Sequence, residues 1–439
     1  MIDIEEIRDA RFMSLLSVAD SSQAKEFVEG FVVFLKSKEI RKRKRQAERE
    51  KAFATAIELI IADLMLGFQQ QDNRWSYHQM SSGSFTDEPV GYKLFRSIVS
   101  ALEEAGLIEV SLGRNHKGIQ WDEGGTTSYA PGLATRFRPT QSLVDMAAQY
   151  GLKEDEYHLS FKTQLPKKVI EVRAAKVKGE GRGRKLKPPQ TSRFFEVEEE
   201  IKTLNLFLSG FELTGGAFTG FRRLFNEGDI KGFDYDRGGR LFNSDGQGYI
   251  GLSSEERQSM QIDGEDIVEI DINASYLTIY HGLIGVPLPN KEDIYAIDGL
   301  PREVVKAWFS VSFGVQKFHT RWPSETIEEL RVSCEAFKPS MTVKAVGKKV
   351  IKHFPIMADW PLSGLSWSKL MFIESEIVIG TMTTMMEKYQ APCFPVHDAI
   401  IVRKKDEELA KNILSKEFEA HADITPRLKL KQALLISPI

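Results

Sequence analysis

Apolar residues recur at helical spacing through most of the first hundred residues. The spacing predicts helix over 22–70, where apolar positions lie three or four residues apart on both sides of a basic run. A second helical pattern follows within 89–113 and ends near Gly106, a residue type that commonly terminates helices. Alternating apolar residues after that glycine predict a strand, and a glycine-rich stretch separates it from another predicted strand over 134–140. We therefore expect helix, helix, strand, hairpin and strand in that order.

Two apolar stretches in the C-terminal half each lead into an aspartate. Residues 267–270 predict a short buried strand that ends at Asp271, and a helical pattern follows. Within 393–403 one apolar run leads to His397 and Asp398, and a second apolar run follows. This pattern predicts a hairpin with the aspartate at its tip. With the helices expected between these strands, the sequence favours an α+β fold.

Composition narrows the class of protein. Of the 439 residues, 42% are hydrophobic and 28% are charged, which provides enough apolar material for sizeable cores. Cys334 and Cys393 are the only cysteines, which excludes a disulfide scaffold and a cysteine-rich zinc site and favours a reducing, cytoplasmic compartment. No apolar run approaches the roughly 18 residues of a membrane span, and the acidic start does not resemble a signal peptide. We therefore expect no membrane association.

The net charge of −3 conceals two basic segments. Residues 36–51 contain nine Lys or Arg against three acidic residues, and residues 162–193 contain eleven against two. Such concentrated positive charge on an otherwise acidic chain is one sign of a protein that binds a polyanion. For 36–51 a solvated helix face explains the charge equally well, and both interpretations stay open. The second segment contains prolines and glycines, so we expect a flexible basic linker over 156–194.

Asp271 and Asp398 are the strongest candidates for chemistry. Placing an aspartate among buried strands is costly unless something compensates its charge. Either residue alone is well explained as a strand-end or turn residue. Together, at the ends of adjacent strands, the two would form a hard oxygen site for Mg²⁺, or for Mn²⁺. Two such ions serve phosphoryl transfer to a 3′-hydroxyl, so the pair predicts a nucleotidyl-transfer site.

A predicted helix between the two aspartates carries two cations on one face. Pro301 can begin a helix, and Arg302 and Lys306 then lie one turn apart, with Phe313 further along. Two cations suit a triphosphate and the aromatic ring suits a base, although an ordinary amphipathic helix gives the same pattern. Upstream, two glycines allow close approach of the main chain and leave Arg240 to reach a phosphate or a minor-groove edge.

In their order, these motifs resemble the polymerase domain of family A DNA polymerases and of the related single-subunit RNA polymerases. The similar segments are GGRLF (238–242), ERQSMQIDGEDIVEIDINASYL (256–277), the helix at 301–314, LMFIESEIVIGTMTTMMEKYQ (370–390) and PVHDAIIV (395–402). The resemblance covers roughly residues 215–435. It implies a right-hand α+β polymerase domain with an antiparallel palm sheet and short fingers.

The same resemblance implies a role for each candidate residue. It implies catalysis by Asp271, Asp398, Arg302 and Lys306, metal binding by Asp271, Asp398 and Ile272, nucleotide binding by Arg302, Lys306, Phe313 and Tyr276, and primer-strand binding by Arg240 and His397.

Three positions depart from the family A pattern. Ala399 stands where DNA polymerases of the family have a glutamate, although the RNA polymerase relatives also lack it. Lys306 and Phe313 are seven residues apart, a spacing that resembles family B polymerases instead. Tyr276 stands where family A has a glutamate and family B has a tyrosine that excludes ribose. An aromatic ring under the sugar favours dNTPs, whereas a packing role for Tyr276 is the simpler alternative.

The N-terminal pattern resembles the winged helix-turn-helix domains of bacterial regulators and plasmid replication initiators. It implies that Lys93 and Arg96 face a DNA groove and that Arg114 and Lys117 lie on the wing, while a winged helix used only for protein contact gives the same pattern. The expected division is a helical basic region (1–52), a winged-helix-like domain (53–155), a basic linker (156–194) and a polymerase domain (195–439).

The sequence therefore predicts a template-directed DNA polymerase without a proofreading exonuclease. Its expected partners are a DNA primer–template, dNTPs and replication proteins, and its expected setting is replication of a plasmid, phage or mobile element in bacteria. Two alternatives stay open. One is a primase or RNA polymerase that begins chains without a primer, and the other is a non-catalytic DNA-binding replication initiator or regulator.

Overall fold

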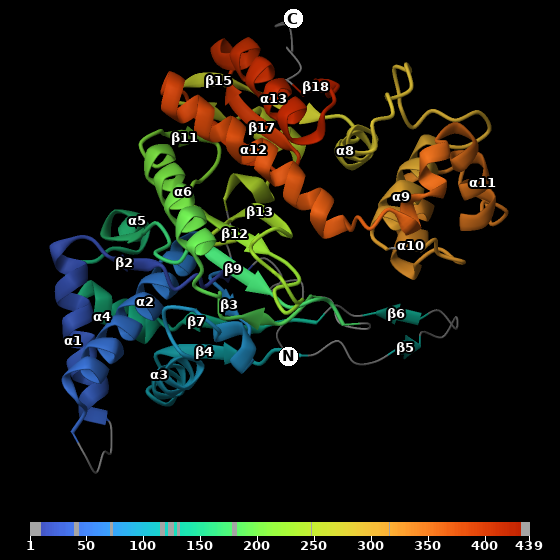
Figure 1. The fold of residues 1–439 in the computed structure, drawn as a ribbon. Helices are drawn as coiled ribbons and strands as arrows, with labels where there is room; N and C mark the ends of the chain where they lie inside the picture. Colours follow the sequence, from blue (N-terminus) through green and yellow to red (C-terminus); the bar gives the residue numbers. More distant parts are fainter. Residues whose placement is uncertain are drawn as a thin grey trace, which may run out of the picture.

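Figure 1 shows the chain as a computed structural model, which describes residues 10–38, 44–70, 73–114, 119–121, 127–129, 132–177, 182–246, 248–315 and 317–431. The described residues mix helices with mainly antiparallel sheets, in agreement with the expected α+β class. They form two large hydrophobic cores, one drawn from residues 13–161 and one from residues 169–422. We call residues 10–163 the N-terminal module and residues 164–431 the C-terminal module.

The N-terminal module combines helices with a small sheet. Its helices are α1 (Ser22–Lys38), α2 (Ala47–Gln70), α3 (Tyr92–Glu104), α4 (Gln141–Ala148) and α5 (Tyr157–Ser160). Its strands are β1 (Arg11–Phe12), β2 (Ser17–Ala19), β3 (Ser76–His78), β4 (Ile108–Ser111), β5 (Ile119–Trp121), β6 (Thr127–Tyr129), β7 (Thr135–Pro139) and β8 (Phe161–Thr163). The main sheet has the order β1-β3-β7-β4, while β2 pairs with β8 and β5 with β6. The expected succession of helix, helix, strand, hairpin and strand is present from α2 to β7, with β3 inserted between the helices.

Helix α2 is the centre of the N-terminal core. Ile57, Ile60 and Leu64 on this helix are fully buried, and α2 packs against α1, α3, α5 and β7. In contrast to the expectation from sequence, α2 is long and apolar enough to cross a membrane. However, 72% of its most apolar stretch is buried inside the module. Core packing therefore accounts for its apolar length.

The expected helix over 22–70 is two helices. α1 ends within the first basic segment, residues 44–46 are not helical, and residues 39–43 lie outside the described residues. Arg45 lies over the Phe53 ring, 3.6 Å from its centroid. The expected domain boundary after residue 52 falls inside α2, because the residues on both sides of it belong to one amphipathic helix.

The expected linker over 156–194 also differs from the structure. It contains α5 and β8 of the N-terminal module and then β9 (Ile170–Arg173) and β10 (Lys185–Leu186), which pair with each other. Val169 and Val172 are fully buried in the C-terminal core. Alternating apolar residues within the basic segment thus place part of it in a sheet, and residues 178–181 lie outside the described residues.

The C-terminal module holds the larger core. Its further helices are α6 (Ser192–Leu208), α7 (Ser254–Gln258), α8 (Ser275–Leu283), α9 (Arg302–Phe313), α10 (Ser324–Ser333), α11 (Val343–His353), α12 (Trp367–Tyr389) and α13 (Glu407–Ala422). Its further strands are β11 (Leu213–Thr214), β12 (Phe221–Phe225), β13 (Gly238–Asn243), β14 (Gln261–Ile262), β15 (Glu265–Ile272), β16 (Cys393–Val396), β17 (Ala399–Arg403) and β18 (Leu428–Lys431). One sheet has the order β10-β9-β12-β13, and another has the order β11-β14-β15-β17-β16, with β18 on the other side of β15.

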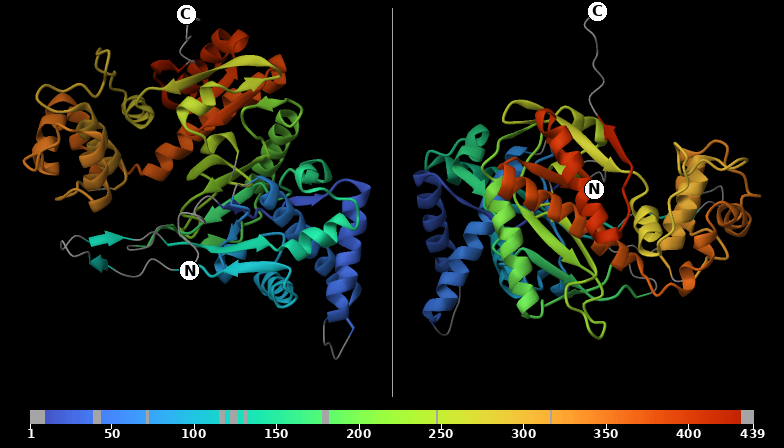
Figure 2. Two further views of the ribbon diagram at one scale, coloured as in Figure 1. Left: turned by 180° about the vertical axis from the view of Figure 1, so that it is seen from behind. Right: turned by 45° about the horizontal axis from the view of Figure 1, so that its top comes forward.

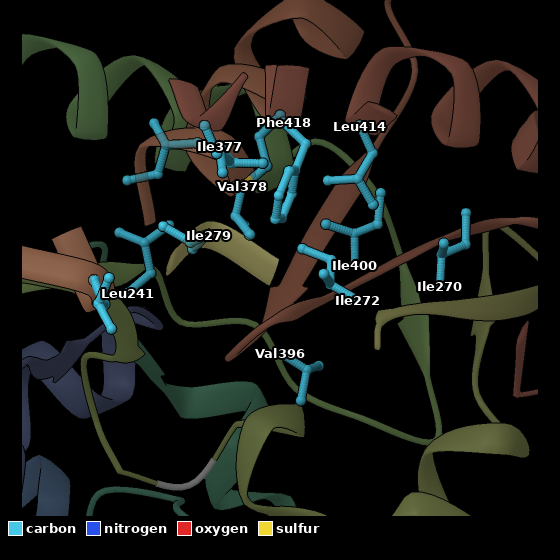
Figure 3. Close-up of a cluster of buried hydrophobic side chains, with 14 of the residues drawn as sticks. Leu241, Ile270, Ile272, Ile279, Ile377, Val378, Val396, Ile400, Leu414 and Phe418 are labelled. Carbon is cyan, nitrogen blue, oxygen red and sulfur yellow. The ribbon is translucent and has the colours of Figure 1, made fainter. Parts of the chain in front are cut away.

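Strand β15 is central because it pairs antiparallel with both β17 and β18. Side chains alternate along a strand, so Ile270 and Ile272 lie on one face and Asp271 on the other. Figure 3 shows Ile270 and Ile272 with Ile400 of β17 near Leu414 and Phe418 of α13. The helices therefore cover one face of the sheet, and the aspartate lies on the opposite face.

Helices α9, α10 and α11 form a separate lobe beside this sheet (Figures 1 and 2). α9 packs against both α10 and α11. The ring of Phe313 on α9 lies 4.9 Å from that of Trp360, whose indole nitrogen donates a hydrogen bond to the Ser312 carbonyl at 2.9 Å. In both figures the β5–β6 hairpin extends toward the same side of the molecule as this lobe.

Candidate functional site

The antiparallel pairing of β15 and β17 places the two predicted aspartates side by side. Asp271 is in register with Ala399, the residue directly after Asp398. The Ile272 main-chain nitrogen donates a hydrogen bond to the Asp398 carbonyl oxygen at 3.3 Å. The predicted hairpin is present, with His397 and Asp398 as the turn between β16 and β17. The two carboxylates, 127 residues apart in sequence, therefore come from neighbouring strand ends.

Strand β18 adds two lysines to the aspartate pair. Lys429 is in register with Asp271 and Lys431 with Glu269, and alternation puts both lysines on the same face of the strand. Lys431 Nζ lies 3.3 Å from Asp271 Oδ2 and 2.8 Å from Glu269 Oε1. Glu269 is buried and also accepts a hydrogen bond from Arg257 Nε at 2.9 Å. The final described strand thus supplies positive charge beside the carboxylates.

Burial and the neighbouring charges act together on Asp271. Burial raises the pKa of Asp271, the negative charge of Asp398 raises it further, and Lys431 opposes the shift. Among the described residues no cluster of three or more His, Cys, Asp or Glu side chains is placed to hold a metal ion. Mg²⁺ commonly uses only one or two carboxylates together with substrate phosphates. Two adjacent hard oxygen donors that repel one another therefore fit such an ion.

The predicted helix begins at Arg302 and presents its cations as expected. Arg302 and Lys306 are both exposed and lie one helical turn apart on α9. Arg302 Nε lies 2.7 Å from Asp293 Oδ2, and its guanidinium lies over the Tyr295 ring, 5.4 Å from the centroid. An anion that reaches this face would have to compete with Asp293 for Arg302. Among the described residues Lys306 has no ion-pair partner.

The aromatic end of α9 is largely buried. Phe313 is only 4% exposed and stacks on Phe309, with the ring centroids 6.0 Å apart. Its ring lies edge to face with Tyr276 of α8, with the centroids 6.2 Å apart. Tyr276 thus connects the helix that follows Asp271 to the helix that carries the cations. Burial raises the pKa of the Tyr276 phenol, and the nearby Glu374 carboxylate raises it further.

Arg240 is held by an acid that the sequence patterns do not reveal. Its guanidinium binds Glu374 of α12 through two nitrogens, with Nε at 2.8 Å from Oε1. Glu374 is 1% exposed, and burial raises its pKa even though Arg240 opposes the shift. Gly238 and Gly239 have φ angles of 78° and 85°, in the left-handed region that favours glycine. A Cβ on Gly239 would lie 2.9 Å from Ser375 Oγ, so glycine there allows the close approach of β13 to α12.

The predicted residues of the C-terminal module largely line one cavity of about 610 Å³. The cavity is lined by Arg240, Asp271, Ile272, Tyr276, Arg302, Lys306, Phe313 and Asp398, all of which were predicted, and also by Tyr295, Phe309, Trp367, Met371, Glu374, Lys429 and Lys431 among others. The carboxylates, the α9 cations and the aromatic rings therefore share one space.

The other predicted residues do not line this cavity. His397 is exposed in the turn, with a φ of 57°, and its ring lies 6.4 Å from that of Phe242. Lys93 and Arg96 are exposed on α3 in the N-terminal module and line none of the described pockets. Arg114 is exposed at the base of the β5–β6 hairpin, and Lys117 lies outside the described residues.

The most informative residues that sequence reasoning missed are Glu374, Lys429 and Lys431. Glu374 lies in the middle of a helix that was predicted only as a helix, and its partner Arg240 is 134 residues away. The lysines alternate with Leu428 and Leu430, which is a weak strand signal near the C-terminus. That alternation could have identified a strand, but not its pairing with β15.

Comparisons with known proteins do not identify a family for this chain. No family model matches the chain, and no curated protein matches its sequence. Among solved structures, one similar chain is the polymerase domain of Pol1 from M. smegmatis in complex with DNA primer-template and dNTP. That match covers 97% of this chain and 67% of the other, with 9% sequence identity and a TM-score of 0.30. A similarity of this size assigns no role to any side chain.

Proposed function

We propose that the chain is a template-directed nucleotidyltransferase and, more narrowly, a DNA polymerase that extends a primer with dNTPs. The observation that carries the proposal is the meeting of Asp271 and Asp398 with Arg302 and Lys306 around one cavity. Two carboxylates opposite two cations match a reaction that joins a metal-bound hydroxyl to a triphosphate. Our interpretation of the β15–β17–β18 sheet as a palm and of α9–α11 as short fingers belongs to the same proposal.

Asp271, Asp398 and the main chain of Ile272 would hold the metal ions. When bound, two Mg²⁺ ions would activate the primer 3′-hydroxyl and neutralise charge on the triphosphate. The raised pKa of Asp271 supports this assignment, because two adjacent carboxylates both stay ionised more easily when a cation lies between them. Lys431 would have to give up its contact with Asp271 or share that carboxylate with an ion.

Arg302 and Lys306 would bind the triphosphate from the opposite wall. The primer oxygen forms a bond to the α-phosphorus, the bond from that phosphorus to the bridging oxygen breaks, and pyrophosphate leaves. Both side chains are exposed and lie one turn apart, so they can follow the negative charge onto the leaving pyrophosphate. Asp293 holds Arg302 in place before a nucleotide arrives.

Tyr276 and Phe313 would form the apolar floor for base and sugar. Their rings meet edge to face, and the Arg240 guanidinium lies over the Tyr276 ring at 5.7 Å. This fixed ring supports dNTP use, since a 2′-hydroxyl would have to fit against it. His397 and Arg240 would contact the primer strand, and Glu374 would hold the Arg240 guanidinium in place for that contact.

For the N-terminal module we propose a winged helix that binds duplex DNA. The support is the order α2, α3, β4, hairpin and β7, together with exposed Lys93 and Arg96 on α3 and exposed Arg114 at the base of the hairpin. Phosphate contacts from such residues would position the duplex without reading its sequence.

Primer extension by an Asp398→Ala variant tests the proposed function. We expect dNTP incorporation on a primed DNA template to fall to background while binding of the same DNA is unchanged. Asp266→Ala is the matched control, because Asp266 is an exposed aspartate on β15 outside the cavity. Full activity of Asp398→Ala would overturn the metal assignment. Binding without any incorporation by the wild type, with Mg²⁺ and with Mn²⁺, would instead favour a non-catalytic DNA-binding protein.

A further inference from the structure

A second cavity, of about 960 Å³, adjoins the first. Gly314, Trp367 and Met371 line both cavities, so the two spaces are neighbours at the start of α12 and the end of α9. The second cavity runs between the modules. Phe12 and Glu88 of the N-terminal module form one side, and strands β9, β10, β12 and β13 of the C-terminal module supply most of the rest.

Positive charge predominates along this inter-module groove. Five basic residues line it, Arg173, Lys176, Arg182, Lys185 and Arg222, against three acidic residues, Glu88, Glu171 and Glu227. The acidic residues engage only some of the cations. Lys185 Nζ lies 2.6 Å from Glu88 and 3.2 Å from Glu171, and Arg222 lies 3.1 Å from Glu88.

Two of the groove cations are available to a ligand. Lys176 and Arg182 are exposed, and neither has an ion-pair partner among the described residues. They come from the basic segment that follows β9, on the two sides of the residues that are not described. The paired cations hold the walls together, and the two exposed cations leave a net positive lining for an anionic chain.

Aromatic rings interrupt this charge. Phe242 on β13 is 37% exposed, unusual for a phenylalanine in a sheet, and lies next to His397. Phe12 is half-buried at the opposite wall, where it stacks on His78 with the ring centroids 5.5 Å apart. Trp367 is half-buried where the two cavities meet. Accessible rings beside cations form a surface on which unpaired bases stack while the backbone follows the charge.

We propose that the inter-module groove binds a single strand of nucleic acid, the template, and leads it into the catalytic cavity. The assignment deepens the proposed function and rests on it. The shared residues Gly314, Trp367 and Met371 place the groove directly beside the cavity that holds Asp271 and Asp398. A single strand fits better than a duplex, because base pairing would hide the bases from Phe242 and Trp367. The N-terminal module and the described residues of the basic segment that line the groove thus serve as walls of the template path.

Binding of a labelled oligothymidylate to the full-length chain, measured by fluorescence anisotropy over a range of salt concentrations, tests the groove directly. The Lys176→Ala, Arg182→Ala double variant should bind more weakly, and its plot of log affinity against log salt should lose about 1.4 of its slope, as expected when two phosphate contacts of a single strand are lost. Phe242→Ala should weaken binding roughly tenfold through lost stacking. Arg184→Ala is the matched control, because Arg184 is exposed in the same segment but does not line the groove.

Each outcome supports or overturns the inference. Unchanged affinity and slope in the double variant, or a loss equal to that of Arg184→Ala, would overturn it. A duplex bound with the same dependence on Phe242 would also overturn it. The experiments distinguish failure of the groove assignment from failure of the proposed function. If the wild type incorporates dNTPs but the groove variants bind the strand normally, only the groove assignment is wrong. If the groove variants bind the strand weakly but the wild type incorporates no nucleotide, only the polymerase assignment is wrong.

Discussion

Lys431 Nζ lies 3.3 Å from Asp271 Oδ2, across the β15–β18 pairing. The same nitrogen lies 2.8 Å from Glu269 Oε1, so one lysine forms ion pairs with two acidic residues of the same strand. Among the described ion pairs, this lysine supplies the positive charge nearest to Asp271. A metal ion at the carboxylate pair must therefore compete with Lys431.

Removing this competitor should tighten metal binding. We expect Lys431→Met to bind Mn²⁺ about two- to fivefold more tightly at pH 8, the size expected for a partly exposed ion pair. Electron paramagnetic resonance of free Mn²⁺ measures this without any assay of activity. Lys429→Met is the control, since Lys429 lines the same cavity but has no ion pair among the described residues. Unchanged or weaker Mn²⁺ binding by Lys431→Met would contradict the competition.

The buried pair of Arg240 and Glu374 should stabilise the C-terminal module strongly. Glu374→Ala leaves a guanidinium that is 21% exposed without its partner, and we expect a loss of about 3 kcal/mol in the free energy of unfolding. Urea denaturation followed by circular dichroism measures the loss. Glu387→Ala, an exposed acid on the same helix, should change stability by less than about 0.5 kcal/mol. Equal losses in both variants would show that the pair has no special role.

Tyr276 should control the choice of sugar. We expect Tyr276→Ala to lower the preference for dNTPs over NTPs about tenfold or more, because the ring no longer fills the space beside the sugar. Tyr276→Phe keeps the ring and should keep the preference. Single-nucleotide incorporation with each nucleotide type gives the two ratios. Equal discrimination in the wild type and Tyr276→Ala would leave Tyr276 as a packing residue of α8.

Buried Asp63 on α2 makes stability depend on pH. Burial raises the pKa of Asp63, although Arg11 opposes the shift. A carboxyl group whose pKa is raised on folding contributes stability below its unfolded pKa of about 3.9, and that contribution is lost as pH rises through the folded value. As pH rises from about 4 to 7, the wild type should lose stability that Asp63→Asn does not lose. The free energy of unfolding of the variant, measured relative to the wild type, should therefore increase. The exposed Asp20→Asn control should show no such trend, and a constant difference for Asp63→Asn would contradict the argument.

Local patterns in the sequence were sufficient for much of the C-terminal site. A strand leading to Asp271, a hairpin tip at Asp398 and a helix carrying Arg302 were all predicted. The structure contains each, although the strand ends one residue later, at Ile272, and the helix begins one residue after Pro301. These features depend on residues close in sequence, where side-chain periodicity and turn chemistry decide the outcome. The meeting of the three elements in one cavity could be expected only from the resemblance to a polymerase.

Other features depend on distant partners and left weak local signals. The N-terminal strands β1, β2, β3 and β8 contain two or three residues each, too few to show alternation. Glu374 matters because it binds Arg240, 134 residues away in sequence. Lys431 matters because it forms an ion pair with Asp271, 160 residues away. The linker expectation failed at β9 because its basic composition masks the alternating Ile170 and Val172.

The most direct test of the central claim is primer extension by the wild type and by Asp271→Ala, with dNTPs and with NTPs, while Mg²⁺ is titrated. The account predicts Mg²⁺-dependent incorporation of dNTPs by the wild type and a loss of at least about 100-fold in the variant, with binding of the primed DNA unchanged. Incorporation by Asp271→Ala at the wild-type rate, or wild-type incorporation that is independent of divalent ions, would contradict it.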